Sequence, residues 1–140
     1  MTFILDTNTV SFLMRGEPDV RAELTARERT DVLLCQPVVA EIEYGLARLP
    51  RSARQKRLRA RFDLFLREML RVPWTDEVST AFGRIKADLE KRGERLEDLD
   101  VAVAAHAVAM GATLVTDDTA HMRRVKGLAL DNWRRPACDR

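Results

Sequence analysis

Short apolar runs alternate with longer stretches of helical period along this chain. The apolar runs predict strands, and they occupy residues 3–6 (FILD), 32–35 (VLLC), 113–116 (TLVT) and 128–131 (LALD). Strands separated by helices in this order predict an α/β fold with a central parallel β-sheet flanked by helices on both faces. Because no repeat, low-complexity segment or linker divides the pattern, we expect residues 1–140 to form a single domain.

The helical stretches differ in how their apolar residues are distributed. Three of them carry an apolar stripe on one side: Val39, Ile42, Leu46 and Leu49; Leu58, Phe62, Phe65, Leu66 and Met69; and Val78, Phe82, Ile85 and Leu89. The fourth, residues 101–110 (VAVAAHAVAM), is apolar on all sides, which predicts a helix buried against the sheet and ended by Gly111. We expect His106, inside this helix, to be a packed residue rather than a ligand.

Acidic residues lie at or after the carboxyl ends of the predicted strands. Asp6 ends the first strand, Glu41 lies early in the helix after the second, Asp100 opens the buried helix, and Asp117 and Asp118 follow residues 113–116. In parallel α/β folds, the working side chains gather beyond the carboxyl ends of the strands, near the point where the strand order reverses. Each acid taken singly is more readily explained as a helix cap, so it is the set that indicates a site.

The distribution of charge indicates the class of partner. The formal net charge is only +2, but residues 51–71 hold eight basic and two acidic residues. Such a segment favours binding to RNA or another polyanion, or to an acidic protein, and a solvated helix face is the alternative interpretation. Arg54, Arg57 and Arg61 are spaced to share one helix face, and they are the candidate RNA-binding residues.

The sequence also bears on where the protein acts. It has no apolar span of 18 residues, and its N-terminus enters a strand-like run at once, so we expect neither a signal peptide nor a membrane anchor. Cys35 and Cys138 have no CxxC neighbours, and a reducing cytoplasm fits them best.

Converging carboxylates limit the chemistry that the site can support. Two of them about 5 Å apart repel by roughly 3 kcal/mol at an effective dielectric constant of about 20, so the set needs protons or a cation. Oxygen ligands without His or Cys suit Mg²⁺ or Mn²⁺, which activate water and neutralise phosphate oxygens. Together with the basic segment, the acids predict phosphodiester hydrolysis. Thr7, Asn8 and Thr116 would orient the carboxylates or the water.

Three segments carry a family resemblance: ILDTNTVS near the N-terminus, PVVAEIEYGLARLP, and DVAVAAHAVAMGATLVTDDTAHMRRVKGLALDNW. They resemble the PIN-domain ribonucleases, specifically the VapC/FitB-type toxins of bacterial toxin–antitoxin pairs. The resemblance spans essentially the whole chain, and residues 51–95 are its least diagnostic part. It implies a PIN fold and a metal-dependent endoribonuclease toxin.

The resemblance also implies roles for particular residues and partners. It selects Glu41 over Glu43, and it makes Asp6, Glu41, Asp100 and Asp118 the catalytic and metal-binding acids. Many relatives have Asn at the position of Asp118, so Asp117 is an added candidate for the fourth acid, or an orienting residue, and Asp98 is a further candidate for binding the metal. A VapB-like antitoxin, a homodimer and a DNA-binding assembly with the antitoxin are the implied protein partners.

Two other classes of function require residues that this chain lacks. A phosphatase with an aspartyl nucleophile requires a second Asp two residues after Asp6, where this chain has Asn8. A response-regulator-like switch requires a phospho-accepting Asp after a central strand and a Lys after a late one, and VLLC and TLVT provide neither. A PIN fold that binds RNA without cleaving it is compatible with the sequence.

Overall fold

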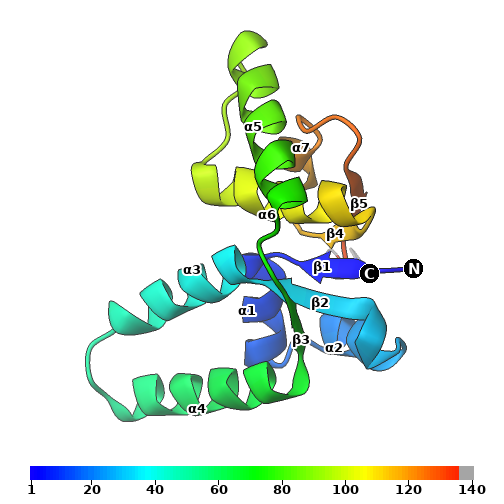
Figure 1. Ribbon diagram of the computed structural model, residues 1–140. Helices are drawn as coiled ribbons and strands as arrows, with labels where there is room; N and C mark the ends of the chain where they lie inside the picture. Colours follow the sequence, from blue (N-terminus) through cyan, green and yellow to red (C-terminus); the bar gives the residue numbers. More distant parts are fainter. Residues whose placement is uncertain (136–140) are drawn as a thin grey trace.

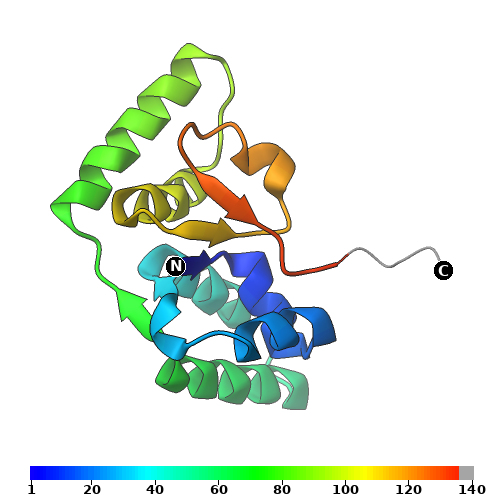
Figure 2. The same cartoon turned by 90° about the vertical axis from the view of Figure 1, so that its right-hand side faces the viewer.

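Five short strands form one parallel sheet in the computed structural model, which describes residues 1–135 (Figures 1 and 2). The strands lie in the order β3-β2-β1-β4-β5, and every neighbouring pair is parallel. Their bounds are Phe3–Leu5 (β1), Val32–Cys35 (β2), Leu70–Val72 (β3), Thr113–Val115 (β4) and Ala129–Asp131 (β5). The predicted α/β fold is therefore confirmed. The domain predicted from the sequence extends to residue 140, and its last residues, with Cys138, lie outside the part described here.

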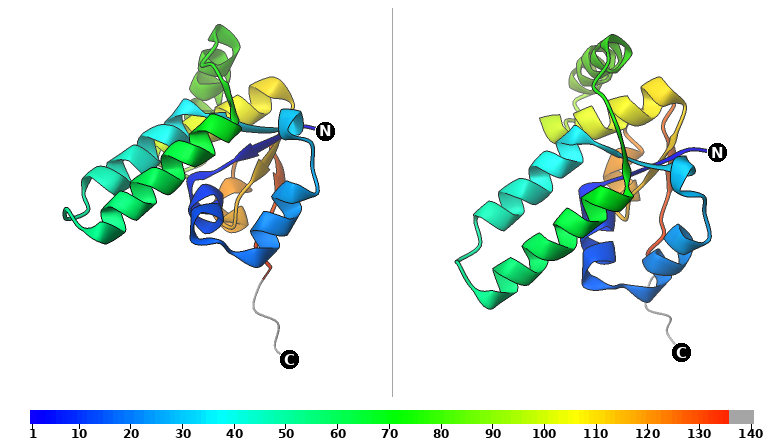
Figure 3. Two further views of the ribbon diagram at one scale, coloured as in Figure 1. Left: turned by 90° about the horizontal axis from the view of Figure 1, so that it is seen from below. Right: turned by 60° about the horizontal axis from the view of Figure 1, so that its bottom comes forward.

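Helices cover both faces of the sheet. Figure 1 shows α1, α2 and α4 below it and α5, α6 and α7 above it. Their bounds are Thr7–Arg15 (α1), Pro18–Thr25 (α2), Gln36–Ala47 (α3), Ala53–Glu68 (α4), Asp76–Lys91 (α5), Asp98–Met110 (α6) and Thr119–Met122 (α7), with a short 3₁₀ helix at Arg29–Asp31. Helices α3 and α4 run side by side as a hairpin that extends away from the sheet (Figure 3).

Helix α6 shows how composition determines position. Its residues from Val101 to Ala107 are all buried, as expected for a helix that is apolar on all sides. It packs against α5 and against the sheet, and it ends at Gly111, whose φ of 63° is the left-handed conformation that glycine adopts at low cost. His106 is fully buried, with Nδ1 2.7 Å from the carbonyl oxygen of Ala102. It is placed as a packed residue, as the sequence indicated.

Strand β3 and helix α2 are among the elements that were not predicted from the sequence. Strand β3 (Leu70–Val72) follows a strongly helical segment, and Met69, assigned above to the helical stripe, is the residue that caps α4. Helix α2 buries only Val20, so it carries no apolar stripe from which a helix can be predicted. Both elements owe their place to packing in three dimensions.

The interior of the sheet is apolar and closely covered. Strands β1 and β2 are buried along their whole length, which is usual for a parallel sheet covered on both faces. Cys35 lies in β2, and burial raises the pKa of its thiol to about 12. Within residues 1–135, no helix is both long enough and apolar enough to cross a membrane.

Candidate functional site

The carboxyl ends of β1 and β4 border a cavity of about 150 Å³. The strand order reverses between these two strands, because β2 lies on one side of β1 and β4 on the other. Residues from separate segments line the cavity, and four of them are acids: Asp6, Glu41, Asp100 and Asp118. Among the described residues, none that lines it is basic. The structure therefore brings together the four acids that the sequence singled out.

Asp6 combines the two roles that the sequence left open. Its Oδ1 accepts a hydrogen bond of 2.8 Å from the backbone N–H of Thr9, which caps α1. Its own backbone N–H donates to the carbonyl oxygen of Val115, and Thr9 Oγ1 donates to the same carbonyl, so the start of α1 is tied to the end of β4. The carboxyl group of Asp6 thus caps a helix and lines the cavity.

Glu41 and Glu43 lie on different faces of α3 and have different partners. Thr7 Oγ1 donates a 3.0 Å hydrogen bond to Glu41 Oε1, which holds this carboxylate at the cavity. Glu43 instead forms an ion pair with Arg59 of α4, on the α3–α4 hairpin. The geometry therefore separates the two glutamates that helical spacing alone did not.

Asp100 is the third residue of α6 and not its cap. The cap is Glu97, whose side chain makes no capping hydrogen bond. Asp98 is exposed, pairs with Lys86 at 3.0 Å and lies outside the 150 Å³ cavity. Asp100 is therefore the acid of this turn that faces the other carboxylates.

The end of β4 distinguishes Asp118 from Asp117. Asp118 lines the cavity, caps α7, and has Oδ1 2.7 Å from Nδ1 of His121. Its backbone N–H donates to Thr116 Oγ1 at 3.0 Å, which fixes the turn after the strand. Asp117 does not line the cavity and accepts a 3.1 Å hydrogen bond from Asn8 Nδ2. Asp118 is therefore placed as the fourth acid and Asp117 as a partner of Asn8.

The carboxyl groups influence one another electrostatically. Burial raises the pKa of Asp6 above its ordinary value of 3.8, hydrogen bonds from Thr116 and Thr9 counteract part of this, and the charge of Asp117 adds to the rise. Burial also raises the pKa of Asp100, and the negative charges of Glu41 and Asp118 raise it further. The site therefore favours protons or cations over an uncompensated set of negative charges.

The donor set fits a hard divalent cation. Every ionisable side chain that lines the cavity is a carboxylate, whose oxygens can bind a metal, and Thr and Asn oxygens complete the polar lining. As placed, no three acidic, His or Cys side chains among residues 1–135 are grouped closely enough to hold one ion. Binding an ion therefore requires the carboxylates to rotate toward one another, which their mutual repulsion opposes until the ion is present.

The structure does not bring the candidate RNA-binding arginines to this cavity. Arg54, Arg57 and Arg61 are exposed on α4. Arg61 Nη1 donates a 3.2 Å hydrogen bond to the carbonyl oxygen of Met14, and the residue lines a separate cavity beside α1 and α2. A role for these arginines in RNA binding remains a prediction.

Sequence reasoning missed the contact of His121 with Asp118 and the apolar residues of the cavity. His121 lies three residues after Asp118, a spacing that puts two side chains of a helical turn in reach of each other, so this signal was available. Val103, Leu114 and Met122 form the apolar part of the lining, and they come from α6, β4 and α7. No local pattern distinguishes these three from ordinary core residues.

The fold agrees with what comparison with known proteins shows. The chain matches the PIN domain over residues 3–128, and it belongs to that family. It is 29% identical over 136 residues to Ribonuclease VapC2 of Rickettsia felis, covering 95% of this chain and 98% of that one. It is 30% identical over 139 residues to VapC ribonuclease Y4jK of Sinorhizobium fredii, covering 96% of this chain and 99% of that one.

A solved structure extends the likeness to three dimensions. VapBC2 from Rickettsia felis, bound to a DNA fragment from its promoter, contains a chain that is 25% identical to this one with a TM-score of 0.84. The match covers 96% of this chain and 100% of that chain. The PIN family and fold predicted from the sequence are thus confirmed.

Proposed function

We propose that this protein is the endoribonuclease toxin of a toxin–antitoxin pair and that it hydrolyses RNA phosphodiester bonds with Mg²⁺ or Mn²⁺. The observation that carries the proposal is the convergence of four carboxylates on one cavity at the reversal of strand order. The relatives named as VapC ribonucleases, matched over nearly their whole length, support the same activity.

The polar residues at the cavity have distinct roles in this reaction. Asp6, Glu41, Asp100 and Asp118 would hold a divalent cation, which would supply activation of water and neutralisation of phosphate charge when it is bound. Thr7 orients Glu41, and Thr116 holds the turn that carries Asp118. Asn8 and Asp117 bind each other at the rim and brace the start of α1 against the end of β4. The water attacks the phosphorus in line while the bond from phosphorus to the leaving ribose oxygen breaks. A carboxylate of the cavity accepts the proton of the water, and the leaving oxygen takes a proton from solvent.

The partners proposed for this chain follow those of its relatives. They are an RNA substrate, a VapB-like antitoxin that blocks the acidic cavity, and a second copy of this chain in a homodimer. The complex with antitoxin binds promoter DNA, as the solved VapBC2 complex does. We place this activity in the cytoplasm, where RNA is available and where the buried thiol of Cys35 stays reduced.

Cleavage of RNA by the purified protein tests this function. Total bacterial RNA should be cut with Mg²⁺ or Mn²⁺ and left intact when EDTA is present. Asp100→Asn should lower the rate by at least about 100-fold, since even residues that only orient metal ligands contribute about 10–100-fold. Asp76→Asn is the matched control, because Asp76 occupies the first turn of α5 as Asp100 does that of α6, yet lies outside the cavity. RNA binding without cleavage by the wild-type protein, with either ion, would contradict the proposal.

A further inference from the structure

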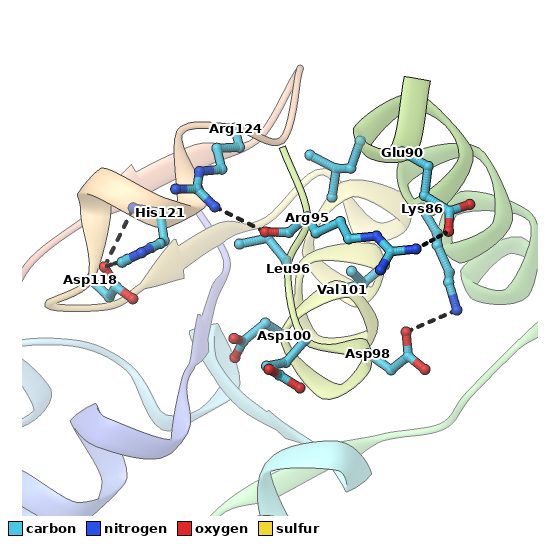
Figure 4. A pocket seen from close by; sticks show the side chains of 12 residues that line it. Lys86, Glu90, Arg95, Leu96, Asp98, Asp100, Val101, Asp118, His121 and Arg124 are labelled. Carbon is cyan, nitrogen blue, oxygen red and sulfur yellow. Dashed lines mark hydrogen bonds and ion pairs between the residues drawn. The ribbon is translucent and has the colours of Figure 1, made fainter. Parts of the chain in front are cut away.

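A second and larger cavity adjoins the acidic one. It has a volume of about 650 Å³, and Asp100 and Asp118 line both cavities. Figure 4 shows Asp118 and Arg124 on one side of it, Lys86 on the other side, and Asp100 and Arg95 between them. A chain that crosses the acidic cavity at Asp100 and Asp118 therefore continues directly into a space bordered by basic side chains.

The basic side chains come from three different elements. Lys86 lies on α5, Arg95 on the loop between α5 and α6, and Arg124 just after α7. Arg124 Nη1 donates a 2.9 Å hydrogen bond to the carbonyl oxygen of Arg95, which holds the segment after α7 against the loop. Leu96 supplies an accessible apolar part of the same lining, whereas Leu89 and Val101, which also border it, are almost fully buried. The cavity thus combines basic and acidic side chains with a small apolar surface.

We propose that this second cavity is a nucleotide subsite, in which Lys86, Arg95 and Arg124 bind the RNA phosphate next to the one that is cleaved. The ribose and base of that nucleotide lie on the apolar side, against Leu96. This inference rests on the proposed ribonuclease function, and it names the residues that position the substrate. These residues differ from the arginines of α4, which line neither cavity at the acids.

The sizes of the two cavities favour this division of roles. Sites that enclose a small organic ligand have volumes of about 300–1,000 Å³. The acidic cavity, at about 150 Å³, is too small for a nucleotide but can receive a phosphate and its cations. The second cavity, at about 650 Å³, falls within the range for a whole nucleotide. The rest of the substrate therefore requires the larger space.

The ion pairs of the basic residues are weak enough to be exchanged for phosphate. Lys86 pairs with Asp98 at 3.0 Å, and their side chains are 43% and 68% exposed. Arg95 pairs with Glu90 at 3.5 Å, and its side chain is 82% exposed. Exposed pairs of this kind contribute only about 0–1 kcal/mol, so a phosphate can displace either carboxylate.

The charge of the lining makes this binding dependent on divalent cations. The second cavity is lined by three basic and five acidic side chains, and two of the acids are Asp100 and Asp118. Without a cation the lining repels RNA overall, whereas neutralising Asp100 and Asp118 leaves basic and acidic side chains equal in number. RNA binding in this cavity should therefore require the cation as well as the basic residues.

A binding experiment with two matched double variants tests the inference. The probe is a 12-nucleotide single-stranded RNA of mixed sequence, labelled with fluorescein and followed by anisotropy in Ca²⁺, with its integrity checked on a gel. Lys86→Gln with Arg95→Gln should weaken binding about tenfold and reduce the slope of log K against log salt by about 0.7, the value for one phosphate contact of a single strand. Arg84→Gln with Lys91→Gln removes the same charge from α5 outside the cavity, and it should change affinity by less than about twofold. EDTA should abolish binding by the wild-type protein to this subsite.

The outcomes separate the subsite from the function on which it rests. Retained metal binding and a retained cleavage rate at saturating RNA, with a raised KM in Lys86→Gln with Arg95→Gln, support the subsite. If the wild-type protein cleaves RNA and both double variants bind the probe equally well, the subsite is overturned and the ribonuclease function stands. If the wild-type protein cleaves no RNA with Mg²⁺ or Mn²⁺, the function fails and the subsite fails with it.

Discussion

At the scale of single residues, the carboxylates of the cavity differ in what else they do. Asp6 caps α1 through Thr9, and Asp118 caps α7 and contacts His121, so both contribute to local structure. Asp100 caps nothing and is held among negative charges. Removing the charge of Asp100 should therefore affect stability and activity in opposite directions.

The destabilising effect of the Asp100 charge should appear in how the stability of the metal-free protein depends on pH. The folded state raises the pKa of Asp100, so it binds the proton more tightly than the unfolded state does. The resulting destabilisation is absent below the ordinary pKa of 3.8, grows as the pH rises through the folded-state pKa, and is complete above it. Asp100→Asn should therefore be neutral near pH 3.5 and stabilising by on the order of 1 kcal/mol at pH 7, since solvent screens the charge repulsion.

Urea unfolding of both proteins in EDTA at the two pH values measures this difference. Asp76→Asn serves again as the control, because it removes an acid from the first turn of a helix that does not line the cavity. If Asp100 acted only as a helix cap, Asp100→Asn would instead leave stability at pH 7 nearly unchanged, because Asn caps a helix as well as Asp does, and Asp100→Ala would lose roughly 0.5–2 kcal/mol while keeping its activity.

The acids themselves could be predicted from sequence, and their partners only in part. Parallel strands bring their carboxyl ends to one edge, so residues after FILD and TLVT were expected to meet there. The distinction between Asp117 and Asp118 depends on the turn that begins α7, which a local pattern does not specify. The same holds for Lys86, Arg95 and Arg124, which line one cavity although they come from α5, the loop after it and the segment after α7.

At the scale of elements, the periodic helices and four of the five strands were predicted, and strand β3 and helix α2 were not. The stripe on residues 58–69 faces the core, with Phe62 fully buried. Strand β3 has three residues, two of them exposed, and its place at the edge of the sheet comes from pairing with β2. It therefore lacks the buried apolar run from which the other strands were predicted.

Helix α4 carries the sequence's most basic segment, and its role is testable as a unit. Replacing Arg54, Arg57 and Arg61 with Gln should weaken RNA binding across sequences and reduce the salt slope by roughly two, because about 0.7 is lost per phosphate contact. Cleavage at saturating RNA should change little, since none of the three lines the acidic cavity. Anisotropy at several salt concentrations measures the slope.

Two other results would redirect this interpretation of α4. Unchanged RNA binding with weaker antitoxin binding would assign the face to the antitoxin, which agrees with the position of Arg61 beside Leu13 and Phe65 in a partly apolar cavity. Unchanged affinity for both would leave the arginines as a solvated helix face.

At the scale of the whole molecule, the protein should behave as a toxin. Expression of this chain alone should arrest the growth of a bacterial host, and co-expression of the antitoxin encoded by the neighbouring gene should relieve the arrest. Asp100→Asn, expressed to the same level, should allow growth because it lacks a carboxylate of the cavity. Normal growth with folded wild-type protein confirmed in the cells would count against the toxin assignment.

The central claim is that the four carboxylates act together as one site for a divalent cation. Titration of the metal-free protein with Mn²⁺, followed by isothermal titration calorimetry, tests it most directly. The wild-type protein and Asp76→Asn should bind Mn²⁺ with the same affinity, and Asp100→Asn and Glu41→Gln should each bind at least about tenfold more weakly. Equal Mn²⁺ affinity in all four proteins would contradict the account.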